Sequence, residues 1–242
     1  MPKCVHCKIE TIKKASQRNL PSELTWDHIP PSSWYPENTQ SNIQRWTVPS
    51  CRKCNNELSL LEDQLRTYVI PAVKKDGAEI LGLRDKVFRS LGIGQNDKLK
   101  SAEFEKRKNL AIKLYKKFRP ASSIKSFYPN FGPFPEYPIE RQREIEIPID
   151  LLTKVFGKIF RGAEYELNNK RINDKPFELN VFVGKDILEF EKFKINYERT
   201  ENLGHGFRVQ RLAGTQSVLY KAVIWGNLIA YGTVDLIIDV RK

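Results

Sequence analysis

The cysteines are the feature that most constrains the fold of this chain, because they form two Cys-x-x-Cys pairs. The pairs are Cys4 with Cys7 and Cys51 with Cys54, and the chain has no other cysteine. Four thiolates at these spacings can close a tetrahedron around one zinc ion, each pair forming a knuckle. A redox pair or unrelated buried thiols are the alternatives, but a redox pair leaves the second Cys-x-x-Cys without a role. The pattern therefore predicts one structural Zn²⁺ site.

Length and composition place the chain among globular proteins. Its 242 residues, 40% hydrophobic and 29% charged, are enough for one large domain or two smaller ones. No apolar run is as long as a membrane span, and the opening residues MPKCVHCKIE lack the apolar core of a signal peptide. We therefore expect a cytoplasmic protein without a membrane partner, in a reducing setting where paired cysteines more often bind metal.

The charge is strongly positive and unevenly distributed. The formal net charge is +12, which favours polyanionic partners. Residues 98–125 hold ten basic and only two acidic residues. A solvated helix face is one interpretation of such a run, and a surface that binds nucleic-acid phosphates is the other. The residues assigned to nucleic-acid contact are Lys98, Lys100, Lys106, Arg107, Lys108, Lys113, Lys116, Lys117 and Arg119.

Hydrophobic periodicity predicts an α+β chain in four parts. A helix should start within residues 52–60 and end or kink at Pro71, which cannot donate a helical hydrogen bond. Further helices are expected over residues 77–92, 101–118 and 148–167. Strands of an antiparallel sheet are expected over 177–184, 191–200, 206–214, 217–226 and 227–240, with a hairpin turn at Gly226-Asn227. The parts are a zinc module (1–66), a basic helical region (67–125), a proline-rich linker (126–138) and an α+β module (139–242).

The segment between the two knuckles carries a second pattern. It contains Asp27-His28-Ile29-Pro30 and then Asn42, and the chain returns to the second knuckle with Asn55 directly after it. This order resembles the HNH endonuclease superfamily in its zinc-knuckle variant, over about residues 4–66. The resemblance implies a ββα-metal fold, in which a β-hairpin and a helix hold one catalytic divalent metal.

The resemblance also implies roles for individual residues. Asp27 matches the first ligand of the catalytic metal, His28 the general base, Asn42 the residue that braces the loop carrying the base, and Asn55 the last ligand. The sequence departs from the family pattern in having Asn rather than His at position 55, and Ser59 where a second helical His would stand.

Alternatives stay open for several of these residues. Asn56 could replace Asn55 as the ligand, and Asn55 could serve only as a helix cap. His28 could be an ordinary buried histidine, and His6 could substitute as a zinc ligand. Trp26, Trp34, Tyr35 and Trp46 could stack on bases or fill a small core. Glu62-Asp63, two turns past Asn55, could support the site or lie on a solvated face.

The chemistry of these residue types suits the phosphodiester hydrolysis that the resemblance implies, with DNA as the expected substrate. Carboxylate and amide oxygens form a hard site suited to Mg²⁺ or Mn²⁺, while the sulfur ligands suit Zn²⁺. A neutral imidazole can accept a proton from water near neutral pH. The resemblance implies products with 5′ phosphate and 3′ hydroxyl groups, and a setting in bacterial or phage DNA processing or anti-phage defence. The alternative is a non-catalytic zinc-ribbon protein that binds nucleic acid or a partner. A protein partner or a second copy could bind through residues 139–242.

Overall fold

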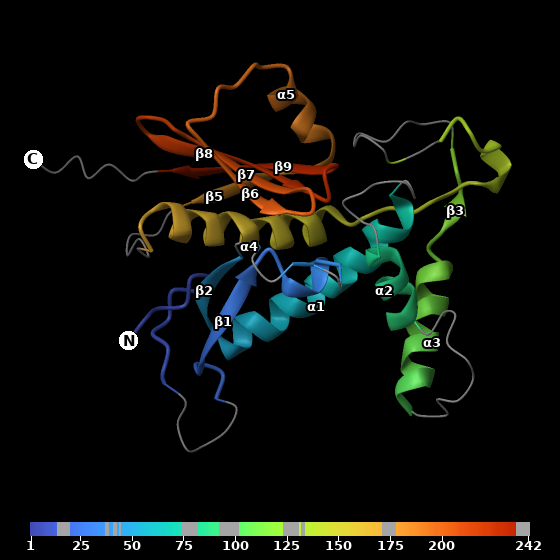
Figure 1. Ribbon diagram of the computed structural model, residues 1–242, viewed down its shortest axis with the longest axis horizontal. Coiled ribbons are helices and arrows are strands. Elements are labelled where there is room, and N and C mark those ends of the chain that lie inside the picture. The colour runs from blue at the N-terminus through green and yellow to red at the C-terminus, as the bar shows by residue number, and fades with distance from the viewer. Residues whose placement is uncertain are drawn as a thin grey trace, which may run out of the picture.

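The computed structural model describes residues 1–13, 20–36, 39–40, 43, 45–73, 82–91, 102–122, 131, 134–170 and 178–235. The described part is a mixed α+β structure whose sheets are all antiparallel (Figure 1). It confirms the predicted α+β class and the antiparallel C-terminal sheet. Among the described helices, none has the length and apolar character needed to cross a bilayer.

The N-terminal unit is a hairpin that runs directly into a helix. Strand β1 (Leu24–Ile29) pairs with β2 (Trp46–Cys51), and α1 (Arg52–Val69) begins at the next residue. Cys51 is the N-cap, because its Sγ accepts a hydrogen bond from the Cys54 backbone N–H at 3.4 Å. The helix gives way to a 3₁₀ turn, η2 (Ile70–Ala72), at Pro71. The helix predicted from residues 52–60 to Pro71 is therefore confirmed.

The described middle of the chain holds helices and one short strand pair. Its elements are α2 (Leu83–Ser90), α3 (Ala102–Tyr115), the paired strands β3 (Arg119–Pro120) and β4 (Arg143–Glu144), and η4 (Ile139–Arg141). The two helices lie inside the ranges predicted for them. Of the proline-rich stretch 126–138, only residues 131 and 134–138 are described.

The described C-terminal part has a long helix, a short helix and a five-stranded sheet in the order β5-β9-β8-β7-β6. The elements are α4 (Ile149–Leu167), β5 (Leu179–Phe182), η5 (Gly184–Asp186), α5 (Ile187–Glu191), β6 (Arg199–Gly204), β7 (Phe207–Ala213), β8 (Ser217–Ile224) and β9 (Leu228–Asp235). The predicted hairpin is confirmed, with left-handed φ values of 51° at Trp225 and 71° at Gly226. The strand predicted over residues 191–200 is wrong for most of its length, because α5 ends there and β6 begins only at Arg199.

Helix α4 is the central layer of the molecule. It lies between the five-stranded sheet on one side and β1, β2 and α1 on the other (Figure 1). Two glycines allow this close approach. A Cβ at Gly162 would lie 2.5 Å from Ile29 Cγ1, and one at Gly232 would lie 2.5 Å from Phe160 Cδ2. An alanine at either position would clash, so the packing of α4 on both neighbours depends on these two missing side chains.

Aromatic side chains join the two ends of the chain in one core. Trp34, from the 3₁₀ turn η1 (Ser32–Trp34), has its ring centroid 4.8 Å from that of Trp225. The Trp225 indole N–H donates to the Trp34 carbonyl at 3.3 Å, and the Tyr35 hydroxyl donates to the Leu203 carbonyl at 3.0 Å. Trp34, Tyr35 and Trp46 are buried, as the core-filling interpretation predicts, whereas Trp26 is 57% exposed. Residues of the predicted 1–66 and 139–242 parts therefore share one hydrophobic core.

Candidate metal centre and the charged cluster beside it

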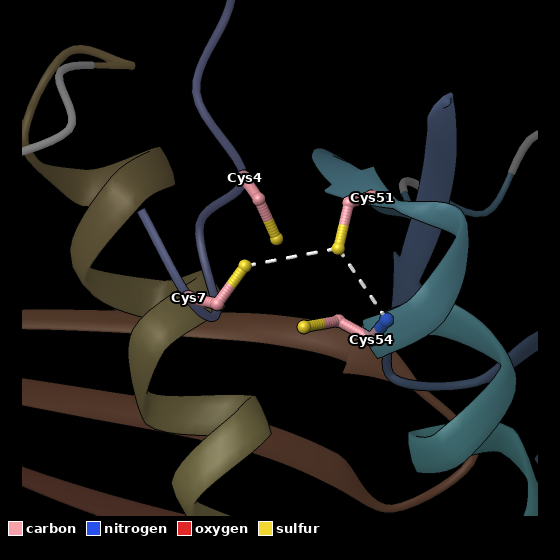
Figure 2. Close-up of side chains that lie close together, drawn as sticks. All are labelled: Cys4, Cys7, Cys51 and Cys54. Carbon is pink, nitrogen blue, oxygen red and sulfur yellow. Dashed lines mark hydrogen bonds between the residues drawn. The ribbon is translucent and has the colours of Figure 1, made fainter. Parts of the chain in front are cut away.

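The four cysteines meet at the junction of the hairpin and α1. Their Sγ atoms all lie within 4.8 Å of one another, and those of Cys7 and Cys51 are 3.7 Å apart (Figure 2). Ligands at about 2.3 Å in a tetrahedron around zinc would be about 3.8 Å apart. The cluster is therefore compatible with a structural zinc site, as predicted, and Cys4 and Cys51 have no exposed surface in it.

The first knuckle is held in place by backbone hydrogen bonds. The Lys8 N–H donates to the Cys4 carbonyl at 2.8 Å, and the Cys4 N–H donates to the Ile9 carbonyl at 2.9 Å. Lys8 itself has a left-handed φ of 63°, which closes the tight turn. The Val5 N–H donates to the Pro49 carbonyl at 2.9 Å, which docks this turn on β2.

The thiols of the cluster differ in acidity. Burial raises the pKa of Cys7 to about 11 and also raises the pKa of Cys54, where the charge of Cys4 adds to the effect. Burial would raise the pKa of Cys4 too, but backbone hydrogen bonds to its sulfur outweigh burial and lower it. Four adjacent thiols cannot all ionise without a compensating cation, and a divalent ion among them would supply that charge.

A second cluster of charged side chains lies on the inner face of the hairpin. The Asp27 carboxylate on β1 accepts a hydrogen bond from His6 Nε2 at 2.9 Å and another from Lys158 Nζ at 2.7 Å. The same Lys158 ammonium donates to Glu62 Oε1 on α1. These four side chains are between 1% and 6% exposed. A lysine from α4 therefore bridges two carboxylates contributed by β1 and α1.

Burial and pairing set the ionisation of this cluster. Burial opposes ionisation of Asp27, but the His6 hydrogen bond and the Lys158 charge outweigh it and hold the pKa of Asp27 below its usual range. Burial raises the pKa of Glu62 to about 7, although Lys158 acts in the opposite direction. Burial lowers the pKa of His6, so its imidazole is neutral and donates the Nε2 proton to Asp27.

The sequence alone did not single out the partners of Asp27. Lys158 is 131 residues away in the chain, so nothing local connects the two. One sign of its role is that Lys158 stands at helical spacing from Leu151 and Val155, on the apolar face of α4. A lysine on such a face needs a buried partner. The solvated-face interpretation is correct for Asp63, which is exposed, and wrong for Glu62, which is 5% exposed.

The proposed catalytic residues lie on two faces of the hairpin. Adjacent residues of a strand point to opposite faces, so half-exposed His28 lies on the face opposite Asp27. Asn55 Nδ2 donates to Thr25 Oγ1 at 3.1 Å, and Thr25 shares the inner face with Asp27. The structure thus places Asp27 and Asn55 on one side of β1 and His28 on the other. The cap alternative for Asn55 is wrong, because Cys51 caps α1.

The other predicted site residues lie at the surface or outside the described residues. Asn42, Lys98 and Lys100 are outside the described residues. Lys106 and Arg107 belong to α3, but their side chains are not among those described. The exposed members of the basic set are Lys108, Lys113, Lys116, Lys117 and Arg119. The Lys117 ammonium also donates to the Tyr68 hydroxyl at 2.5 Å, which ties the end of α3 to α1.

Asp27 and Asn55 supply the oxygen donors that Mg²⁺ and Mn²⁺ prefer. Asn55 uses its amide nitrogen in the bond to Thr25, which leaves the amide oxygen for another partner. Both Asp27 oxygens already accept hydrogen bonds. The donor types fit a hard divalent cation, and binding one at Asp27 requires Lys158 to withdraw.

Comparison with protein-family models, with curated proteins and with solved structures finds no match to this chain.

Proposed function

We propose that this chain is a metal-dependent HNH-type endonuclease or nickase that hydrolyses DNA phosphodiester bonds on a zinc-stapled ββα unit. The observation that carries the proposal is the path of the chain through β1, β2 and α1. The hairpin enters the helix through Cys51, and the four sulfur atoms gather at that junction. This arrangement brings Asp27 and Asn55 to one face of β1, with oxygen donors suited to a hard cation.

In this proposal His28 is the general base and takes a proton from the attacking water. Its imidazole lies on the more open face of β1, within reach of solvent and opposite Asp27. The proposal therefore requires β1 to turn locally, so that the base and a cation at Asp27 meet at one phosphate. A divalent cation, when bound, would offset charge on the phosphate and on the leaving 3′ oxygen. Asp27 would exchange Lys158 for that cation, so the arrangement described here is a closed one. Helix α4 would have to shift before the inner face of the hairpin meets a substrate.

The basic surface supports DNA as the partner. Lys108, Lys113 and Lys116 on and after α3 are exposed, and Arg119 follows at the start of β3. Exposed lysines bind phosphates without reading bases, so the proposed contact is independent of sequence and sensitive to salt. Replacing Lys108, Lys113 and Lys116 together by Gln should weaken DNA binding. It should also reduce the slope of the logarithm of the binding constant against the logarithm of the salt concentration, by the equivalent of about three phosphate contacts.

The test is a plasmid-nicking assay with Mg²⁺ or Mn²⁺ that compares the parent protein with His28→Ala. The parent should relax supercoiled plasmid, and His28→Ala should be at least ~100-fold slower, because general-base catalysis contributes about 10²–10⁴. His205→Ala is the matched control, since His205 lies against Tyr35 near the β6–β7 turn. It should cut as the parent does. Equal cutting by the parent and His28→Ala would rule out His28 as the base.

The ion pair of Asp27 with Lys158 favours a second candidate, a non-catalytic zinc-scaffolded protein that binds nucleic acid. Pure binding needs no free carboxylate, and a buried lysine that already neutralises Asp27 suits a structural role for that residue. A parent protein that binds plasmid but fails to cut with either metal would select this candidate.

A further inference from the structure

The zinc centre proposed above would carry a large negative charge in a partly buried place. Four thiolates and one Zn²⁺ leave a net charge of about −2. Cys4 and Cys51 are fully buried, Cys54 is half-buried and Cys7 is exposed. Charge held away from water is costly unless a partner of opposite sign lies nearby. The centre therefore calls for a cation from a surrounding element.

Three nearby basic side chains already have carboxylate partners. Arg52, next to Cys51, is 2.9 Å from the Glu23 carboxylate. Lys158 is bonded to Asp27 and Glu62, as described above. Lys154 on the same helix is 2.9 Å from Asp150. None of these three cations is left to balance the sulfur cluster.

Arg161 on α4 differs from these basic residues. Its Nε is closed off from solvent, and no acceptor for it exists in the described part of the chain. It lines a groove of about 440 Å³ together with Cys54 and His6. Because Arg161 and Lys154 share this groove with Cys54, α4 borders the second cysteine pair. Burial lowers the pKa of Arg161, and the negative charges of Cys54 and Cys4 act against that lowering.

We propose that Arg161 is the counter-charge of the zinc–tetrathiolate centre, and that zinc binding and the docking of α4 therefore support each other. Arg161 is a positioning residue here, because it acts on the sulfur ligands and does not itself bind the metal. Arg161 is half-buried, and a guanidinium suits this role because it stays charged even away from water and spreads its donors over a plane. Substituting a residue that contacts the ligands of a metal, without binding the metal itself, typically lowers metal affinity by about 10–100-fold.

The location of Arg161 gives this pairing a structural consequence. Arg161 lies one turn after Lys158, so α4 presents two successive cations to the two anionic clusters of the N-terminal unit. Zinc binding and the docking of α4 are thermodynamically linked. If docked α4 raises the affinity for zinc, bound zinc must stabilise docked α4 by the same free energy. Removing zinc should therefore loosen α4, the element that also covers Asp27.

The experiment uses the full chain and needs no nuclease activity. Zinc content of the parent is measured first, and transfer of zinc to a coloured chelator is then timed for the parent, Arg161→Met, Arg161→Lys and Lys154→Met. Cobalt-substituted samples give a second readout, the sulfur-to-cobalt charge-transfer band. Arg161→Met should release zinc at least ~10-fold faster. Its band should move to lower energy, because the sulfur electrons lose a nearby positive charge.

The two control variants separate charge from packing. Arg161→Lys keeps the charge and should stay close to the parent in both readouts. Lys154→Met removes a charge from the same groove and should change neither, since that lysine is paired with Asp150. A parent-like Arg161→Met, or an Arg161→Lys as fast as Arg161→Met, would overturn the proposal. A parent that contains no zinc would overturn both this inference and the zinc site on which it rests.

A double-mutant cycle covers the case in which Arg161→Met folds poorly. Cys7→His lowers the net charge of the centre to about −1, because a neutral imidazole replaces a thiolate. Arg161→Met should then cost less zinc affinity and less stability in the Cys7→His background than in the parent. An equal loss in both backgrounds would mean that Arg161 acts through packing alone, which would also overturn the proposal.

Discussion

Replacing Lys158 by Met tests whether the charged cluster under α4 stabilises the fold as described. The substitution keeps the length of the side chain and removes the ammonium that bridges Asp27 and Glu62. Both carboxylates are about 5% exposed, so water cannot replace the lost cation without opening the structure. Asp27 retains only its bond from neutral His6.

The expected loss follows from the cost of an unpaired buried charge. Removing one partner of a buried ion pair typically costs about 3–5 kcal/mol. At pH 8 Glu62 of the parent is mostly ionised, because its pKa is about 7. Without Lys158, which lowers that pKa, the variant must either bury the Glu62 charge unpaired or take up a proton. We therefore expect Lys158→Met to lose about this much free energy of unfolding at pH 8. For a chain of this size, the loss corresponds to a melting temperature lower by about 10 °C. At pH 5.5 Glu62 is protonated, so the loss should be smaller.

The assay is urea unfolding followed by tryptophan fluorescence at both pH values. Glu62→Gln in the Lys158→Met background should recover part of the stability at pH 8, because a neutral amide needs neither an unpaired buried charge nor the uptake of a proton. Lys154→Met, one turn earlier on α4, is the control, since its surface pair with Asp150 should contribute at most ~1 kcal/mol. The reasoning fails if the free energy of unfolding of Lys158→Met lies within about 1 kcal/mol of that of the parent at pH 8. It also fails if Glu62→Gln restores none of the stability lost in Lys158→Met.

Three further predictions concern other parts of the same structure. Cys51→Ser should abolish zinc binding, measured by metal analysis, and should unfold the N-terminal unit, because structural zinc contributes on the order of 10 kcal/mol to small folds. Retained zinc and an unchanged melting temperature would contradict this prediction. Gly162→Ala should cost about 1–3 kcal/mol in urea unfolding, because its Cβ would lie 2.5 Å from Ile29 Cγ1, and an unchanged midpoint would refute that packing. The pKa of Glu62 is about 7 in the folded chain, against the usual 4.5. The protonated side chain therefore adds to the free energy of unfolding in full below about pH 4.5, and this contribution is lost as the pH rises through 7. The parent should therefore lose about 3 kcal/mol relative to Glu62→Gln between pH 4.5 and 8, and parallel stability curves would show that Glu62 titrates normally.

Much of the local structure follows from the sequence. The two Cys-x-x-Cys pairs predict the sulfur cluster, because the spacing within each pair allows one tight turn to present two thiols to the same point. The apolar spacing from Leu151 to Phe160 predicts α4, and Pro71 predicts where α1 ends. The strand predicted over residues 191–200 failed because a short helix, α5, takes up its first residue and the chain becomes extended again only near Arg199.

The surroundings of Asp27 could be decided only by the tertiary structure. Its position on β1 is local information, but its partners come from the first knuckle, from α1 and from α4. Helical spacing shows that Lys158 lies on the same face of α4 as apolar residues. It does not show which carboxylate will pair with Lys158. That depends on how α4 packs, through Gly162 against Ile29 and through Phe160 against Gly232. Local patterns therefore determine the elements and the sulfur cluster, while the long-range packing of α4 determines the charge environment of Asp27.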